Sequence, residues 1–248
     1  MLSRSERVKR RAEWRSGALL SGFVATGLMT IILVAAYLVA GFLGSPGRES
    51  PILARWLWAL ANNTVTERAH TAFPIAVALQ FVSGLFWALV YAAAAEPRLK
   101  GPGWRRGLTF SLFPWVLSLL VFLPAVGGGA LGLHLGAGPL PIVGNLVLHL
   151  VYGAVLGQMY GPWGERLQTE TGEPENLGEL PALAHDQRFI AVGIVGGLAV
   201  GTVVGGLGSA LFGLGSRPLV AAVLGAIAGS AGGAFIGSFA GLSPGRAR

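Results

Sequence analysis

Imidazole side chains are the groups in this sequence with the clearest capacity for chemistry. The chain has 248 residues, four histidines and no cysteine, which excludes disulfides, zinc-thiolate sites and cysteine nucleophiles. Three of the histidines, His70, His134 and His149, fall in or beside apolar segments. If these segments cross a membrane, as argued below, all three histidines lie nearer to the same side of it. Imidazole binds both metal ions and haem iron. A haem or metal site at these three residues is therefore one interpretation.

A second interpretation gives His149 a structural role. Asn145 precedes it by four residues and so shares its helix face, and Gln80 lies at the equivalent depth of another apolar segment. We expect Gln80, Asn145 and His149 to make polar contacts between helices. Tyr91 and Tyr160 fall near a membrane interface, where a ring with one wet end is stable. On this interpretation there is no cofactor and no metal, and haem is the alternative.

Motifs for common enzyme chemistry are absent from the sequence. It contains no phosphate-binding loop, no dinucleotide-binding glycine fingerprint and no HExxH metal motif. A relaxed GxSxG string at residues 206–210 falls inside an apolar segment without an acidic partner. We also find no carboxylate or amine in the middle of an apolar segment, although ion-coupled transporters usually need one. These observations predict no catalytic residue and no enzyme.

Composition and charge spacing predict an integral membrane protein. Charged residues make up 12% of the chain, against about 25% in soluble domains. Five windows lack any charged residue, and they lie at 16–47, 69–95, 107–164, 189–216 and 218–245. A membrane-spanning helix needs about 20 apolar residues, and the longest window holds two spans separated by the Gly/Pro-rich stretch 127–141. The prediction is six spans, at about 17–43, 71–95, 107–126, 141–161, 189–213 and 217–241.

These spans define an all-α fold with two membrane parts. The predicted organisation is a basic N-terminus (1–16), a four-helix transmembrane unit (17–161) with an interfacial helix at about 50–63, an acidic linker (162–187), a transmembrane hairpin (188–242) and a short tail (243–248). Pro114 is expected to kink the third span. The interfacial helix is apolar on one face and carries tryptophans that favour the headgroup level.

The distribution of Lys and Arg predicts the orientation. Of the 18 basic residues, fourteen fall in segments that the six-span arrangement places on one side, and four (Arg48, Arg55, Arg68 and Arg217) fall on the other. By the positive-inside rule, the richer side is cytoplasmic. Both termini and the linker are then expected to be cytoplasmic, and the expected location is an inner membrane. This rule accounts for the net charge of +7 without a nucleic-acid partner.

Glycines recur at four-residue intervals in the last two spans. The fifth span carries Gly193, Gly197, Gly201 and Gly205, and the sixth carries Gly225, Gly229, Gly233, Gly237 and Gly241. A four-residue interval places them on one helix face, and small residues let two helix backbones approach closely in lipid. We expect a glycine zipper here, with Ala231 on another face.

Spans 2 and 4 contain a related pattern. The segment LQFVSGLFWALVYA (79–92) aligns with LHLVYGAVLGQMYG (148–161), so that Gly84 matches Gly153 and Tyr91 matches Tyr160. This similarity suggests two helix pairs in a parallel repeat. Gly84, Gly153 and Gly157 are therefore predicted helix-packing positions.

Four pieces of the chain resemble a known family. They are GFVATGLMT (22–30), His70 before the second span, GPGWRRGLTFSLFPWVLSLLVFLPAVGGG (101–129) and NLVLHLVYGAVLGQMYG (145–161). Residues 15–161 are similar to a family of small bacterial multi-pass membrane proteins of unknown function. The resemblance implies a four-helix membrane unit and no established activity. It does not extend to the last two spans.

Together these patterns favour a non-enzymatic membrane protein. Its expected role is an accessory or assembly subunit of a membrane complex, or a homo-oligomer packed through small-residue faces. Its expected partners are the lipid bilayer and other membrane subunits or further copies of the chain. Two alternatives remain, namely a haem- or metal-binding electron-transfer subunit and a passive channel or transporter.

Overall fold

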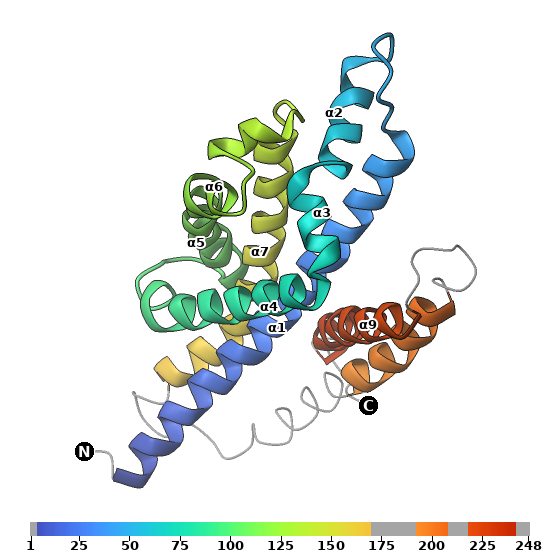
Figure 1. The fold of residues 1–248 in the computed structure, drawn as a ribbon. Helices are drawn as coiled ribbons and strands as arrows, with labels where there is room; N and C mark the ends of the chain where they lie inside the picture. Colours follow the sequence, from blue (N-terminus) through green and yellow to red (C-terminus); the bar gives the residue numbers. More distant parts are fainter. Residues whose placement is uncertain (1–3, 170–191, 208–217, 242–248) are drawn as a thin grey trace.

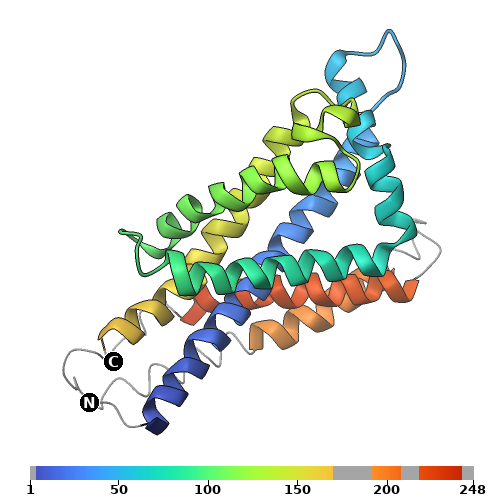
Figure 2. The same ribbon diagram turned by 60° about the vertical axis from the view of Figure 1, so that its left-hand side comes forward.

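The computed structural model describes residues 4–169, 192–207 and 218–241, and all regular structure within them is helical. Figures 1 and 2 show the arrangement. The elements are α1 (Arg4–Leu43), α2 (Ile52–Ala61), α3 (Thr64–Thr71), α4 (Phe73–Val90), η1 (Tyr91–Ala95), α5 (Gly103–Leu117), η2 (Ser118–Phe122), α6 (Leu123–Ala125), η3 (Ala130–Leu135), α7 (Leu140–Thr169), an unlabelled helix Val192–Leu207 and α9 (Pro218–Gly241). The predicted all-α class is confirmed for these residues.

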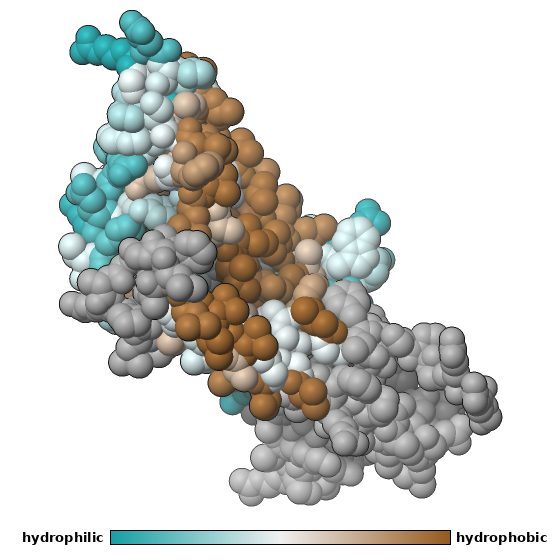
Figure 3. All heavy atoms as spheres, turned by 90° about the vertical axis from the view of Figure 1, so that its right-hand side faces the viewer, coloured by the Kyte–Doolittle hydropathy of each residue, from teal (hydrophilic) through white to brown (hydrophobic). Residues whose placement is uncertain are grey.

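Four helical segments are long and apolar enough to cross a membrane, counted over the described ranges. They are Trp14–Leu43, Phe73–Ala95, Gly103–Ala125 and Leu140–Gly161, within a few residues of the first four predicted spans. Apolar side chains form a broad brown band on one face of the molecule (Figure 3). The predicted fifth and sixth spans correspond to shorter apolar stretches, Val192–Leu207 and Gly225–Gly237. These features fit a membrane protein with four candidate spans.

Several predicted segments fall partly outside the described residues. Helix α7 continues to Thr169, so the first part of the predicted linker at 162–187 is helical. The rest of that linker, the connection between the last two helices at 208–217 and the tail at 243–248 lie outside the described ranges. Helix α1 begins at Arg4, well before the predicted start of the first span.

The core of the four-helix unit lies where α1, α4, η1, α5 and α7 meet. Val24 of α1, Tyr91 of η1 and Leu156 of α7 are each fully buried in one cluster. Helix α7 packs against both α1 and α5, while α4 packs mainly against α1. In lipid, the backbone N–H and C=O groups of a segment must pair with each other, and a helix achieves this. The cluster therefore joins helices whose backbone hydrogen bonds are already made.

The predicted interfacial segment at about 50–63 contains one helix, α2, and a second short helix, α3, follows it. Helix α2 packs against α1, and the Ser45 amide donates to the Ala54 carbonyl at 3.0 Å to close the connection. Asn63 then starts α3, because its side-chain oxygen accepts hydrogen bonds from Val65 and Thr66 amides at 3.0 Å each. Asn is a strong N-cap residue. The capping signal explains the second helix, which the sequence reasoning did not include.

Two of the spans contain a π-helical turn. Pro114 lies inside α5, where it lacks the backbone donor that an α-helix needs. The π-helix η2 begins four residues later, and the Ser118 amide donates to both Pro114 and Trp115 carbonyls. The second π-helix, η1, ends the Phe73–Ala95 span. Single π turns often occur at functional sites, and η1 leads directly into a buried charge.

Candidate functional site

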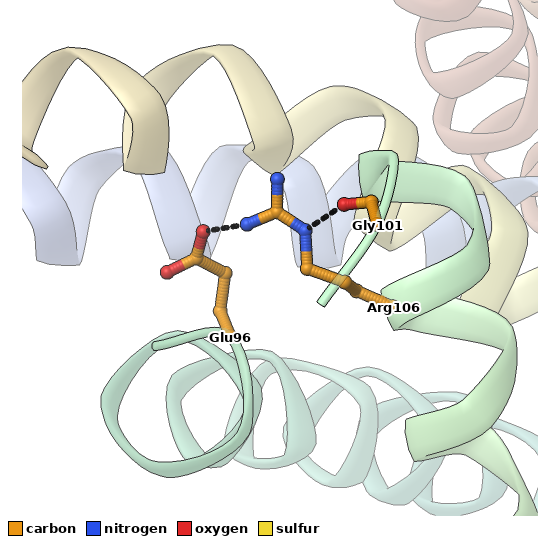
Figure 4. A network of polar contacts seen from close by, with 3 residues as sticks. All are labelled: Glu96, Gly101 and Arg106. Carbon is orange, nitrogen blue, oxygen red and sulfur yellow. Dashed lines mark hydrogen bonds and ion pairs between the residues drawn. The ribbon is translucent and has the colours of Figure 1, made fainter. Parts of the chain in front are cut away.

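Glu96 and Arg106 form a buried ion pair at one end of the four-helix unit. The side chains are 3% and 9% exposed, and Arg106 Nη1 donates to Glu96 Oε1 at 2.5 Å. Arg106 Nε also donates to the carbonyl oxygen of Gly101 at 2.7 Å. Figure 4 shows the guanidinium reaching from α5 between these two groups. Charge-assisted bonds of this kind are stronger than neutral ones, so Arg106 links η1, the following turn and α5.

Local backbone geometry places both charges. The Glu96 amide donates to the Tyr91 carbonyl at 2.8 Å, which is the wide hydrogen bond of a π-helix. The chain then turns through Gly101, whose φ of +105° suits glycine because it has no Cβ. Helix α5 begins at Gly103, so that Arg106 falls in its first turn. The turn is short enough to bring the two charges together.

Two tyrosines lie beside the ion pair. The rings of Tyr91 and Tyr160 meet edge to face, with centroids 5.9 Å apart, and Tyr91 also contacts Phe110 at 5.2 Å. Tyr91 is 0% and Tyr160 is 2% exposed, so neither ring has the solvent-facing end that the sequence predicted. The Tyr91 hydroxyl has no hydrogen-bond partner among the described residues. The end of the bundle therefore combines a buried ion pair with two buried phenols.

Sequence reasoning missed this site because it treated Arg106 as a loop charge. One signal was present: Glu96 is the only carboxylate between Glu67 and Glu165. A single acid at the end of a span, followed ten residues later by an arginine at the start of the next, favours pairing, because an isolated charge in an apolar setting is costly.

The three candidate histidines belong to separate elements. His70 of α3 is exposed, and its ring meets Tyr37 edge to face at 5.5 Å. His134 of η3 is exposed. His149 of α7 is half-buried, and its Nδ1 hydrogen-bonds to the Asn145 carbonyl at 2.9 Å, within its own helix. Within the described ranges, His, Cys, Asp and Glu form no group of three or more that could hold a metal ion.

The predicted interhelical polar residues behave differently from one another. Asn145 joins two helices, because its Nδ2 donates to Ser118 Oγ at 2.8 Å and its Oδ1 accepts from the same hydroxyl at 3.1 Å. His149 instead bonds to its own helix. Gln80 is half-buried, and no hydrogen bond joins its side chain to another described residue. A further cross-helix bond, not predicted, runs from the Tyr152 hydroxyl to the Gly84 carbonyl at 2.6 Å.

These contacts predict different effects for two matched substitutions. Asn145→Leu removes a bond between helices, which averages about 0.6 kcal/mol in membrane proteins, and leaves Ser118 without that partner. His149→Leu removes only a bond within α7, so we expect a smaller loss. Thermal unfolding of both purified variants in the same detergent measures this order. A larger loss of thermal stability in His149→Leu than in Asn145→Leu would contradict the assignment of the His149 bond to its own helix.

Glycines mediate the contact between α5 and α7. A Cβ built on Gly153 or Gly157 would lie within 3 Å of the carbonyl oxygen of Gly107 or Gly103, and the reverse holds for both partners. Real Cβ atoms essentially never come that close. Gly153 and Gly157 were predicted packing positions, whereas Gly103 and Gly107 were not. Their four-residue spacing is visible in the sequence, but Gly103 lies before the predicted start of the third span at about 107, so the pair was not identified.

Gly84 makes the corresponding contact in the first helix pair. A Cβ on Gly84 would lie within 3 Å of Thr26 Oγ1 in α1, whereas one on Gly153 would meet Gly107 and Ser111 in α5. Gly84 and Gly153 are matched positions in the two aligned segments, and each faces the span that precedes its own. The matched Tyr91 and Tyr160 contact each other. The contacts follow the pattern expected of a parallel repeat.

The glycines of the last two helices face one another. A Cβ on Gly193, Gly197, Gly201 or Gly205 would lie within 3 Å of a backbone carbonyl oxygen of α9. The same is true of Gly225, Gly229 and Gly233 against the helix Val192–Leu207. Gly237 is buried, and Gly241 is the last residue of α9. Figure 2 shows the two helices side by side.

Comparison with known proteins supports the resemblance of the first part of the chain. Residues 14–171 match the model of a family of unknown function (DUF6789). No curated protein matches the chain, and no solved structure matches it. The matched residues contain all four candidate spans, the Glu96–Arg106 pair and the glycine contact between α5 and α7. Because the match covers more than half of the sequence, the chain belongs to this family of unknown function (DUF6789).

Proposed function

We propose that this chain is a non-enzymatic protein of the bacterial inner membrane that acts as an accessory or assembly subunit, either with other membrane proteins or with further copies of itself. One observation carries the proposal: two polar side chains inside the four-helix unit, Arg106 and Asn145, bond to neighbouring helices and turns. Arg106 bonds to Glu96 and Gly101, and Asn145 bonds to Ser118. Groups used in this way hold helices together.

The proposed arrangement has six spans with both termini in the cytoplasm. The last two helices cross as a glycine-zipper hairpin, which is supported by the close approach of their backbones. The N-terminus at 1–16 and the linker at 162–187 lie on the cytoplasmic side, as favoured by the fourteen-to-four distribution of basic residues. In this arrangement the turn that holds Glu96 and Arg106 is also cytoplasmic.

The outer surface of the spans supports association with lipid or other subunits. Ile75, Leu79, Val82 and Phe86 follow one stripe of α4 and are between 55% and 65% exposed. An apolar stripe of this size faces lipid tails or another helix. Lipid and partner helices are therefore the proposed surroundings of the four-helix unit.

Purification of the full chain in a mild detergent tests the proposal. We expect a particle heavier than one 25.6 kDa chain after the detergent mass is subtracted, containing either several copies or a second membrane protein. The visible spectrum of the same sample should show no Soret band. A monomer without co-purifying protein would contradict the subunit role. A Soret band that disappears in His149→Leu would favour the electron-transfer alternative.

A further inference from the structure

The turn between η1 and α5, together with the first turn of α5, exposes three basic side chains. Arg98, Lys100 and Arg105 are all exposed, and Trp104 between them is 47% exposed. None of the three basic groups forms an ion pair with another residue in the described ranges. Trp and Lys or Arg together are typical of the headgroup level of a membrane.

Burial of Glu96 removes the only carboxylate of this stretch of sequence from the surface. No other carboxylate occurs between Glu67 and Glu165 in the sequence. Glu96 faces the interior and bonds to Arg106, the fourth basic residue of the segment. The interior therefore holds one charge of each sign, and the exposed part of the turn keeps three positive charges.

Hydrogen bonds hold this turn in one shape. Arg106 Nε donates to the Gly101 carbonyl at 2.7 Å, and the Arg105 amide donates to the Pro102 carbonyl at 3.0 Å. Arg98 Nη1 donates to the Ala94 carbonyl at the end of η1, and a guanidinium has further donors for a ligand. A surface that is already ordered loses little entropy when it binds.

The position of the turn identifies the ligand. It joins the end of the candidate span Phe73–Ala95 to the start of the span Gly103–Ala125, which is the depth of lipid headgroups. We infer that Arg98, Lys100, Arg105 and Trp104 form a binding site for the headgroup of an anionic phospholipid. Juxtamembrane basic residues attract anionic lipid, and arginine pairs with phosphate through two parallel hydrogen bonds. The inference rests on the proposed membrane location.

Lipid titration of the full-length protein tests the site. The protein in neutral detergent is titrated with phosphatidylglycerol or phosphatidylcholine, and bound lipid is counted by native mass spectrometry. The variant Arg98→Gln/Arg105→Gln should bind phosphatidylglycerol about 30-fold more weakly than the original chain, because each basic residue near the membrane surface contributes about fivefold. The control Arg48→Gln/Arg55→Gln removes the same charge from two other exposed residues and should leave binding unchanged. Lys100→Gln alone provides a second, milder test of the same surface.

Several outcomes would overturn the inference. Equal weakening in the site variant and the control would mean that only net charge matters. Equal binding of the two lipids would exclude a role for the anionic headgroup. Inorganic phosphate that competes with phosphatidylglycerol and binds as tightly would indicate a site for free phosphate. Carbonate extraction of cell membranes separately tests whether the chain is integral, so a failed membrane location is distinguishable from a failed lipid site.

Discussion

Replacement of Glu96 with Gln is expected to destabilise the four-helix unit by about 3–5 kcal/mol. The substitution keeps the shape of the side chain and removes its charge. Arg106 then retains a positive charge at a position where its side chain is 9% exposed, without the carboxylate that compensates it. Breaking a buried pair costs more than the pair contributes, because the remaining charge is still desolvated.

Thermal unfolding in lipid-free detergent measures this effect. Glu67→Gln is the matched control, because Glu67 is exposed in the first turn of α3 and the same chemical change there should cost well under 1 kcal/mol. Equal losses in the two variants would show that Glu96 does not depend on Arg106.

A double substitution separates the charge from the packing. Glu96→Leu/Arg106→Met removes both charges and keeps similar side-chain volume, which is often neutral or stabilising at buried pairs. We expect it to recover most of the stability lost in Glu96→Gln. Some loss should remain, since Met cannot replace the Arg106 bond to the Gly101 carbonyl.

The four candidate spans were predictable because they depend on one property. A run of apolar residues long enough to cross a membrane needs no knowledge of its neighbours, so the charge-free windows located these helices within a few residues. Which side chains pair between helices depends on how each helix is rotated about its axis and on the depth of each residue in the bundle. The charge-free windows give neither. Asn145 was therefore predicted as a polar residue between helices, but Ser118, its partner on η2, was not.

The positive-inside rule did not reveal the Glu96–Arg106 pair. Counting basic residues by side gives orientation, yet it treats every Arg near a span end as solvated. Arg106 is turned inward by α5, while Arg105, next to it, is exposed. Only the helical rotation that starts at Gly103 distinguishes the two. The sequence alone therefore showed where charge gathers, and the structure was needed to show which charge is buried.

A single methyl group should have opposite effects at two adjacent glycines of α9. Gly233→Ala adds a Cβ within 3 Å of the Gly193 carbonyl oxygen, whereas Gly232→Ala adds one with no heavy atom of a neighbouring element within 4 Å. Alanine is a better helix former than glycine by up to about 1 kcal/mol. Gly232→Ala should therefore be neutral or stabilising. Gly233→Ala should destabilise by about 1–3 kcal/mol, as expected for overpacking.

The helix Val192–Leu207 offers the same comparison from the other side. Gly197 faces the Gly229 carbonyl, and Gly196 has open space around it. Thermal unfolding of Gly197→Ala and Gly196→Ala should reproduce the difference in sign, and Leu in place of Ala should enlarge the loss at Gly197. Ala231 is a poor control, although it lies off the glycine stripe, because it is fully buried and a Cβ on Gly27 of α1 would collide with it.

The sign of the difference separates close packing from compositional bias. If the glycines were present only because the chain is rich in small residues, each Gly→Ala change would act through helix propensity alone, and all four variants would shift in the same direction. If the two backbones are in contact, the loss of stability depends on which helix face carries the substitution. Gly233→Ala and Gly197→Ala are then destabilising, while Gly232→Ala and Gly196→Ala are not. Close contact is what holds helices together in lipid, where burial of apolar surface gains little.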